Sequence, residues 1–203
     1  DEHWKNIKLK EIEDIILSVS GVYLEVSSDE ASSNPREQVG LKIELLNRSA
    51  SDVALDKLML STGKSFDSVI PLKENQRVAL EKEIQIPAGT PFTSPYWLNE
   101  KGSLGMYKVE NPEFIGKPET PRALHADFVL DFDGYKIPIK RPVVYRYAKP
   151  DKGELYQPFE ILPEATARFS DKVIIFADGN PKQIPITVKA HKDNLKGEVQ
   201  FCY

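Results

Sequence analysis

The sequence holds two pairs of residues whose types and spacing could begin a metal site. His125 and Asp127 are two residues apart, as are His191 and Asp193, so on a strand each pair would lie on one face. A catalytic zinc site needs three protein ligands, and the sequence suggests no third ligand near either pair. It therefore favours solvated positions at a strand start and at a turn over metal ligation.

Three aspartates stand close together in the segment that follows His125. Asp127, Asp131 and Asp133 are spaced to share one face of a hairpin, and clustered carboxylates suit hard cations such as calcium. The spacing of an EF-hand loop is absent. A solvent-facing strand with an aspartate in its turn is the favoured interpretation.

Nucleophilic catalysis finds no support in the sequence. The chain has no Gly-x-Ser-x-Gly, Walker or Rossmann pattern, and its three scattered histidines nominate no Ser–His–Asp set. Cys202 lies in an alternating segment without an indicated base, and no pair stands out among the 31 acidic residues. Asn47-Arg48-Ser49 fits a glycosylation sequon, but turn chemistry alone explains it. We therefore predict that this chain is not an enzyme and holds no cofactor.

The strongest candidate for binding is an aromatic, irregular segment over residues 88–122. Tyr96, Trp97 and Tyr107 could form a platform on which sugar rings stack, because aromatic faces suit the C–H faces of sugars. Alternatively, these rings anchor the segment onto a sheet or a neighbouring domain. Anchoring is the favoured alternative, since burial dominates the energetics of aromatic side chains.

Composition narrows the class of protein. The chain has 203 residues, 40% of them hydrophobic and 29% charged, enough to bury a core without disulfides. A net charge of −4 and the lack of a basic stripe argue against nucleic-acid binding. No apolar run approaches the ~20 residues of a membrane span, and a single cysteine excludes an internal disulfide.

One helix is predicted, over residues 5–20. Its apolar side chains recur at helical spacing, Gly21 is a plausible stop, and we expect Leu9, Ile12 and Ile16 to pack against a sandwich. The stripe consists of Leu9, Ile12, Ile15, Ile16 and Val19.

The rest of the chain alternates with period two and predicts about ten short strands. Residues 126–132 and 135–139 flank Asp133-Gly134, which predicts a two-residue type I′ turn. Pro138 and Pro142 cannot donate to a ladder, so their strand lies at an edge or bends between two sheets. The fold class is all-β, with immunoglobulin-like β-sandwiches and one N-terminal helix.

Three parts are expected along the chain. Residues 1–21 form a helical connector, and residues 22–150 form a sandwich with the irregular excursion 88–122. Residues 149–153 read as a linker-like break. Residues 158–203 form a second, incomplete sandwich with a buried run at 173–176 and a last strand over 199–203. We expect the chain to be a segment of a longer protein.

Several stretches, read together and in order, resemble the region that follows the catalytic domain in large PIG-L (LmbE-like) deacetylases. The stretches are Ile15-Ile16-Leu17 with Gly21–Glu25, Leu45–Ser49, Pro95-Tyr96-Trp97-Leu98, Gly105-Met106-Tyr107, Ile115–Glu119, Arg141–Tyr145 and Tyr156–Glu160.

The resemblance implies a non-catalytic accessory region of a zinc-dependent deacetylase that acts on N-acetylated sugars. The family's catalytic motifs, His-Pro-Asp-Asp and His-x-x-His, do not occur in this sequence, so zinc is expected only in an absent catalytic domain. The implied partners are adjacent domains of the same polypeptide, and also a glycan. The implied location is outside the cytoplasm: periplasmic, cell-surface or extracellular. A free-standing carbohydrate-binding or protein-interaction module is the alternative.

Overall fold

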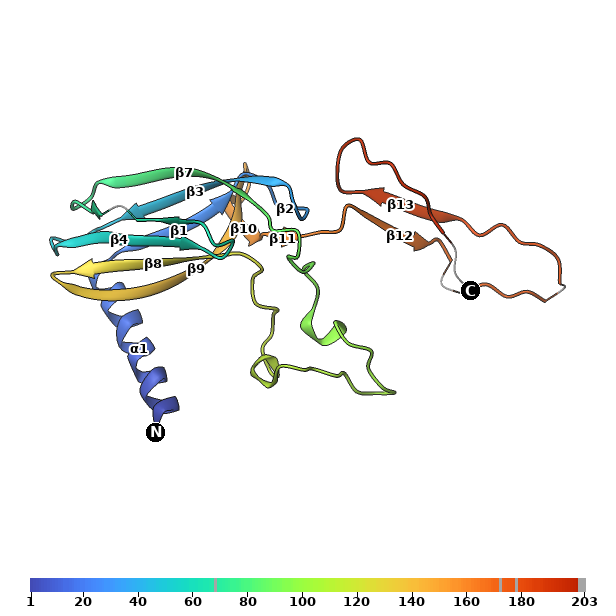
Figure 1. Ribbon diagram of the computed structural model, residues 1–203, viewed down its shortest axis with the longest axis horizontal. Helices are drawn as coiled ribbons and strands as arrows, with labels where there is room; N and C mark the ends of the chain where they lie inside the picture. The colour runs from blue at the N-terminus through green and yellow to red at the C-terminus, as the bar shows by residue number, and fades with distance from the viewer. Residues whose placement is uncertain (68, 172, 178, 201–203) are drawn as a thin grey trace.

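A computed structural model describes residues 1–67, 69–171, 173–177 and 179–200 (Figure 1). The chain begins with one α-helix, α1 (Glu2–Ser20), and continues mainly as strands. The strands are β1 (Tyr23–Ser28), β2 (Ser32–Ser33), β3 (Gln38–Leu46), β4 (Val53–Leu60), β5 (Ser65–Phe66), β6 (Ile70–Pro71), β7 (Arg77–Gln85), β8 (His125–Phe132), β9 (Tyr135–Lys149), β10 (Gly153–Pro158), β11 (Glu160–Ile161), β12 (Ala165–Phe169) and β13 (Ile186–Ala190). Two short 3-10 helices, η1 (Tyr96–Leu98) and η2 (Pro112–Phe114), lie between β7 and β8.

Most strands belong to one curled sheet with the order β5-β4-β8-β9-β1-β3-β7. β10 joins it at β9 and β6 joins it at β4. The sheet curls so that β3 and β7 lie across from β8 and β9, with the apolar core between them (Figure 1). The predicted all-β class with one N-terminal helix is confirmed at the coarser level: the chain is mostly β with one N-terminal helix. The immunoglobulin-like sandwich stays a prediction.

β9 connects the two halves of this curled sheet. Its first part, Tyr135–Pro142, pairs antiparallel with β8, and residues 143–145 pair parallel with β1. The change of partner falls at Pro142, as expected if a proline interrupts one ladder. The predicted edge position holds for residues 135–142, which pair with β8 alone among the described strands. The strand then changes partner to β1 and β10 within one curled sheet, rather than between two sheets.

The core is built by the alternation that the sequence predicts. On β3, Val39, Leu41, Ile43 and Leu45 are all at most 3% exposed, and they belong to one core cluster with buried residues of β4, β8 and β9. β4 pairs with β8 through a bulge between Leu55 and Lys57, and this extra residue produces the change of phase seen in the sequence.

The turn between β8 and β9 is the predicted type I′ turn. Asp133 and Gly134 both have positive φ angles, 50° and 87°. Asp131 closes the turn, because its Oδ1 accepts a hydrogen bond from Gly134 N at 2.6 Å.

Helix α1 forms as predicted, but its apolar stripe is not buried. Asp1 caps it, and Gly21 ends it in the left-handed conformation with φ 63°. Only Leu17 and Ser20, near its C-terminal end, are buried. The predicted packing holds for Ile16, which is partly buried against the core. For Leu9 and Ile12 it is wrong: they are 42% and 53% exposed, because the helix runs away from the sheet (Figure 1). Helical periodicity shows which side is apolar, not whether a partner covers it.

The sheet continues past residue 150. Residues 149–153 form the turn between β9 and β10, with Gly153 at φ 73°, so their interpretation as a linker-like break is wrong. β11 then pairs parallel with β2. Pro, Asp, Lys and Gly residues are typical of both turns and linkers. Only the pairing of β10 with β9 shows that residues 149–153 form a turn. The division of the chain into domains stays a prediction.

The C-terminal part holds a separate two-stranded sheet, β12–β13. The predicted buried run at 173–176 is wrong, since Val173, Ile175 and Phe176 are 77%, 71% and 56% exposed. Among the described residues no second layer covers this hairpin. Of the last strand predicted over 199–203, Val199 lies outside any strand, and residues 201–203, with Cys202, lie outside the described residues.

Candidate functional site

The irregular segment 88–122 leaves the sheet after β7 and returns at β8. Its start is fastened to β11: Thr93 N donates to Ile161 O at 2.8 Å, and Ile161 N donates to Thr93 Oγ1 at 2.9 Å. Its helices η1 and η2 meet through the rings of Tyr96 and Phe114, whose centroids are 5.7 Å apart. The segment is therefore folded on itself and joined to the sheet.

Tyr96 is the anchor of this segment. It is 9% exposed, and its hydroxyl donates to Lys117 O at 3.0 Å. Its backbone N donates to Thr120 Oγ1 at 3.0 Å, which in turn donates to Ser94 O. With its ring buried and its hydroxyl bonded, Tyr96 does not offer a face to a ligand.

Trp97 and Tyr107 lie together on the outside of the segment. Both line an open hollow of about 420 Å³, together with Leu98, Glu100 and Met106. Trp97 is half-buried and Tyr107 is 67% exposed. The structure thus brings two of the three predicted platform residues to one hollow and places Tyr96 behind them.

Local backbone geometry forms the far wall of this hollow. Ser103 N donates to Met106 O at 3.0 Å, and Gly105, with φ 81°, makes the turn between them. A Cβ at Gly102 would stand 2.6 Å from Met106 O, so glycine is needed for this approach. Met106 and Tyr107, which follow this turn, line the hollow together with Trp97. Such a hollow suits a sugar ring or an apolar side chain.

We predict that Tyr96 stabilises the fold and that Tyr107 does not. Tyr96→Ala is expected to lower the free energy of unfolding by about 3 kcal/mol, because it empties a buried aromatic site. Tyr107→Ala, at an exposed position, is expected to change it by less than about 0.5 kcal/mol. Urea unfolding of the two variants checks this, and similar losses for both would contradict the assigned roles.

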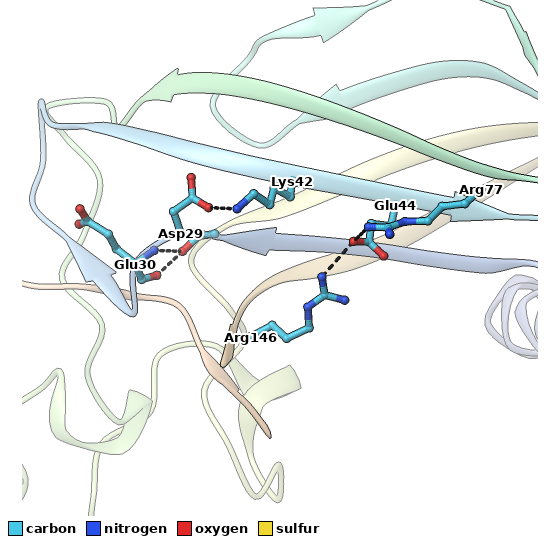
Figure 2. Close-up of polar contacts among 7 residues, drawn as sticks. Asp29, Glu30, Lys42, Glu44, Arg77 and Arg146 are labelled. Carbon is cyan, nitrogen blue, oxygen red and sulfur yellow. Dashed lines mark hydrogen bonds and ion pairs between the residues drawn. The ribbon is translucent and has the colours of Figure 1, made fainter. Parts of the chain in front are cut away.

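A charged cluster on the outer face of the sheet was not anticipated from the sequence. Glu25 on β1 and Glu44 on β3 are buried, with side chains 8% and 11% exposed. Arg146 on β9 reaches both: its Nη2 donates to Glu44 Oε1 at 2.9 Å, and its Nη1 lies 3.1 Å from Glu25 Oε1, an ion pair without hydrogen-bond geometry. Arg77 on β7 contacts Glu44 from the other side (Figure 2). The cluster ties four strands together.

The protonation of this cluster follows from burial and from its charges. Burial opposes ionisation of Glu44, but the hydrogen bonds and charges of Arg146 and Arg77 outweigh it and lower the pKa of Glu44. Burial and a hydrogen bond to Glu25 raise the pKa of Tyr23 above its usual value. Two carboxylates face two guanidinium groups, so the cluster is a neutralised structural network rather than an acid–base pair poised for catalysis.

A second ion pair lies beside this cluster on the same face. Lys42 Nζ donates to Asp29 Oδ1 at 2.7 Å (Figure 2). Asp29 lies over Gly40, where a Cβ would stand 2.4 Å from its Oδ2. Glu81 and Glu83 line the same shallow surface. This pair is half-exposed and contributes little to stability.

The candidate metal ligands are distributed among other contacts. His125 and Asp127 do share a face of β8, with Nε2 and Oδ2 3.5 Å apart. The next charged group there is Lys140, whose Nζ lies 3.6 Å from Asp127 Oδ1 and opposes a bound cation. Burial, and then the Lys140 charge, lower the pKa of His125. His191 Nε2 is 3.1 Å from Thr166 Oγ1.

The aspartates of the β8–β9 hairpin do not converge either. Asp131 closes the turn and Asp127 pairs with His125, so they serve separate contacts. Within the described part of the chain, no group of three His, Cys, Asp or Glu side chains is placed to hold a metal ion.

The sequon residue Asn47 is a structural residue. It is 0% exposed, and its Nδ2 donates to Ser51 O at 2.9 Å and to Leu72 O at 3.0 Å. Its Oδ1 accepts from Ser49 N and Ser49 Oγ, both at 3.0 Å. The interpretation of Asn47-Arg48-Ser49 as turn chemistry is confirmed, and in this fold the amide nitrogen is inaccessible to a glycan.

Comparisons with known proteins give only distant likenesses. No protein-family model and no curated protein match the chain. One similar solved structure is the sporulation control protein Spo0M from Bacillus subtilis, with a TM-score of 0.32 and 12% identity over 59% of this chain and 47% of that chain. Another is the alkylpurine DNA glycosylase AlkC from Pseudomonas fluorescens bound to DNA containing an abasic site analog, with a TM-score of 0.28 and 13% identity over 60% of this chain and 30% of that chain.

These likenesses support no argument about function. The chain spans about half the length of Spo0M and under a third of AlkC.

Among the described residues no helix has the length and apolar character needed to cross a membrane.

Proposed function

We propose that this chain is a non-catalytic accessory region that packs against an adjacent domain of the same polypeptide and sets its spacing. The observation that carries the proposal is the outward face of α1. Five large apolar side chains of this one helix are at least 42% exposed: Trp4, Leu9, Ile12, Ile15 and Val19.

The way α1 is held suits a connector. Leu17 is buried and Ile16 packs partly against the core, so the C-terminal end of the helix is fixed on the sheet. The N-terminal turns project away from it (Figure 1). Covering each exposed Ile or Leu would stabilise a contact by up to about 1.5–3 kcal/mol. An adjacent domain that covers this face would therefore be held in a defined orientation.

The deacetylase context of the proposal rests on the sequence resemblance to the region after the catalytic domain of PIG-L (LmbE-like) proteins. In that context the parent protein is an exported, zinc-dependent N-acetyl-sugar deacetylase. Zinc belongs to the catalytic domain and not to this chain. Two of the resembling stretches have structural duties here: Asn47 closes a buried turn, and Tyr96 anchors the excursion. Such duties suit a region whose part is to be a stable support.

The test begins with the coding region on both sides of the segment. The expected result is a single reading frame with His-Pro-Asp-Asp and His-x-x-His motifs upstream. The longer protein should release acetate from N-acetylglucosamine oligomers with zinc, and residues 1–203 alone should not. Hydrolysis by residues 1–203, or stop codons close to both ends, would overturn the proposal.

Contact through α1 has its own readout in the longer protein. Ile12→Lys with Ile15→Lys is expected to increase protease cleavage at the junction with the upstream domain. Asp14→Lys, an exposed polar position on the same helix, is the matched control and should leave cleavage unchanged. Equal cleavage of both variants would contradict a packed helix.

Glycan binding is the second candidate function, and the hollow between Trp97 and Tyr107 favours it. Glu100 in the same hollow adds a hydrogen-bond acceptor. Glu100 Oε2 lies 3.9 Å from Lys108 Nζ, so the two side chains form an ion pair. Trp97→Ala is expected to abolish binding of chitin oligomers in calorimetry while the melting temperature changes little. Phe92→Ala, an exposed aromatic outside the hollow, serves as the control. No heat of binding from the unmodified chain would remove this candidate.

A further inference from the structure

The hollow in the irregular segment 88–122 combines aromatic rings with a single charge. Trp97 and Tyr107 both line it. Of the eight described residues that form its lining, Glu100 alone is charged at neutral pH. Lys101, the next residue along the chain, does not belong to the lining. The hollow therefore offers aromatic faces and one carboxylate to the same ligand.

The tryptophan of this hollow is held in place. Trp97 packs edge to face with the buried Tyr96, with ring centroids 4.9 Å apart and ring planes at 86°. Tyr96 is itself fixed, because its hydroxyl donates to Lys117 O at 3.0 Å. The segment extends away from the curled sheet (Figure 1), and Tyr107 is 67% exposed. A ligand therefore reaches a ring whose position is set before binding, which lowers the entropic cost of binding.

The carboxylate of Glu100 is only weakly engaged. Its Oε2 lies 3.9 Å from Lys108 Nζ, which is beyond hydrogen-bond distance. The same Nζ lies 4.0 Å from Glu110 Oε1. The side chains of Glu100 and Lys108 are 40% and 63% exposed, and an exposed ion pair of this kind contributes little. One lysine thus faces two carboxylates, which leaves an excess of negative charge beside the rings.

We propose that this hollow binds an organic ammonium ion, and that the ligand is a sugar ring that carries a protonated amino group. The inference deepens the glycan-binding candidate and rests on it. Aromatic rings attract a cation through their quadrupole, and they also pack against the C–H face of a sugar. In the complex the ammonium group takes the place of Lys108 beside Glu100, and Lys108 keeps Glu110 as its partner. A neutral sugar has the stacking contact without this ion pair.

A sugar ring suits the hollow better than a lysine side chain does. The hollow has a volume of about 420 Å³, which is in the range of sites for small molecules. A lysine side chain brings the same charge, but its flexible stem loses rotamer freedom when it is held. In an amino sugar the ring itself fixes the ammonium group next to the stacking face. The ligand class is therefore an amino sugar rather than a basic peptide.

The experiment is calorimetry of residues 1–203 with two trimers, one of glucosamine and one of N-acetylglucosamine. It is run at about pH 5.5, where amines are protonated and carboxyls are ionised. We expect the glucosamine trimer to bind about fivefold more tightly. Glu100→Gln keeps the size of the side chain and should reduce this preference below about twofold. Glu113→Gln removes the same charge from an exposed position outside the hollow and, as the matched control, should leave the preference unchanged.

Lys108→Gln has an expected effect of the opposite sign. It removes the competing cation from Glu100 and should tighten binding of the glucosamine trimer about twofold. Thermal unfolding shows whether each variant keeps the fold.

Three outcomes would overturn the inference, and they separate it from glycan binding itself. Equal affinities for the two trimers, or a preference that survives Glu100→Gln, would remove the ammonium site and leave glycan binding in place. Binding of neither trimer would remove both. An N-acetyl-lysine amide that binds as tightly as the glucosamine trimer would show that a peptide is the source of the ammonium group.

Discussion

Arg146→Met is expected to lower the free energy of unfolding by about 3 kcal/mol at pH 7, or the melting temperature by about 10 °C. Arg146 is the one side chain shown to reach both buried carboxylates, Glu25 and Glu44, among the described residues. Methionine keeps much of its length and volume, so the loss measures the two carboxylates left without it. Arg77 remains on Glu44 and limits the effect.

The pH dependence of this loss distinguishes electrostatics from packing. In the unmodified chain the pKa of Glu44 is lowered, so its stabilisation is present above the unfolded pKa of about 4.3 and is lost as the pH falls through the folded pKa. In Arg146→Met, Glu44 keeps its burial but loses the arginine that lowers its pKa, so its protonated form is favoured more than in the unmodified chain. The variant should therefore come closer to the unmodified chain below about pH 4 in urea unfolding.

Three further variants check the origin of the effect. Arg141→Met removes a guanidinium group from the same strand. This group donates to the backbone carbonyl of Lys140, and its removal should lower the free energy of unfolding by less than about 1 kcal/mol. Arg146→Lys keeps the positive charge but cannot reach both carboxylates. Its loss of unfolding free energy should lie between the losses of Arg146→Met and Arg141→Met. Glu25→Gln with Glu44→Gln should recover part of the loss in Arg146→Met. A loss that does not vary with pH would contradict the ion-pair origin.

The parts of the fold that the sequence predicts well depend on local rules. The Asp133-Gly134 turn needs two positive φ angles, which these residues adopt readily, and it forms as predicted. The change of phase in β4 appears as a bulge beside Leu55. The alternation at residues 39–45 builds the core of β3. In each case the information lies within a few residues along the chain.

The parts that the sequence misses depend on contacts between distant segments. The apolar stripe of α1 and the run at 173–176 are exposed, because apolar residues indicate a preference for burial but do not supply the covering surface. The charged cluster needs the parallel pairing of β1 with β9, which joins residues more than a hundred positions apart. The sequence does place opposite charges at outward positions of these strands. It does not show which strands pair, or in which register, so it cannot show that these charges meet.

The aromatic site shows the same division. The sequence places Trp97 and Tyr107 in one irregular segment, and the structure brings both to one hollow. The sequence also predicts Tyr96 as a platform residue beside Trp97. Successive residues of a 3-10 helix point about 120° apart, so these neighbours in η1 take different roles: Tyr96 points inward and Trp97 lines the hollow.

Asn47→Ala is expected to lower the free energy of unfolding by about 4 kcal/mol, or the melting temperature by about 10 °C or more. The buried Asn47 side chain joins two backbone segments: its own loop, through Ser49 and Ser51, and the segment after β6, through Leu72. Alanine would leave two carbonyls and one N–H without this partner, at about 1–3 kcal/mol for each buried group. The variant also removes volume from a fully buried position.

Asn47→Asp separates the donor role from the size of the side chain. Aspartate keeps an acceptor for Ser49 N but places an oxygen where Nδ2 donates to two carbonyls, Ser51 O and Leu72 O. It is therefore expected to cost at least as much as alanine at pH 7. Asn6→Ala, at an exposed helical position, is the control and should leave thermal unfolding within about 1 °C. A melting temperature of Asn47→Ala close to that of the control would mean that the loop after β3 does not depend on this amide. In that case the conformation of residues 47–52 would have to come from their backbone alone.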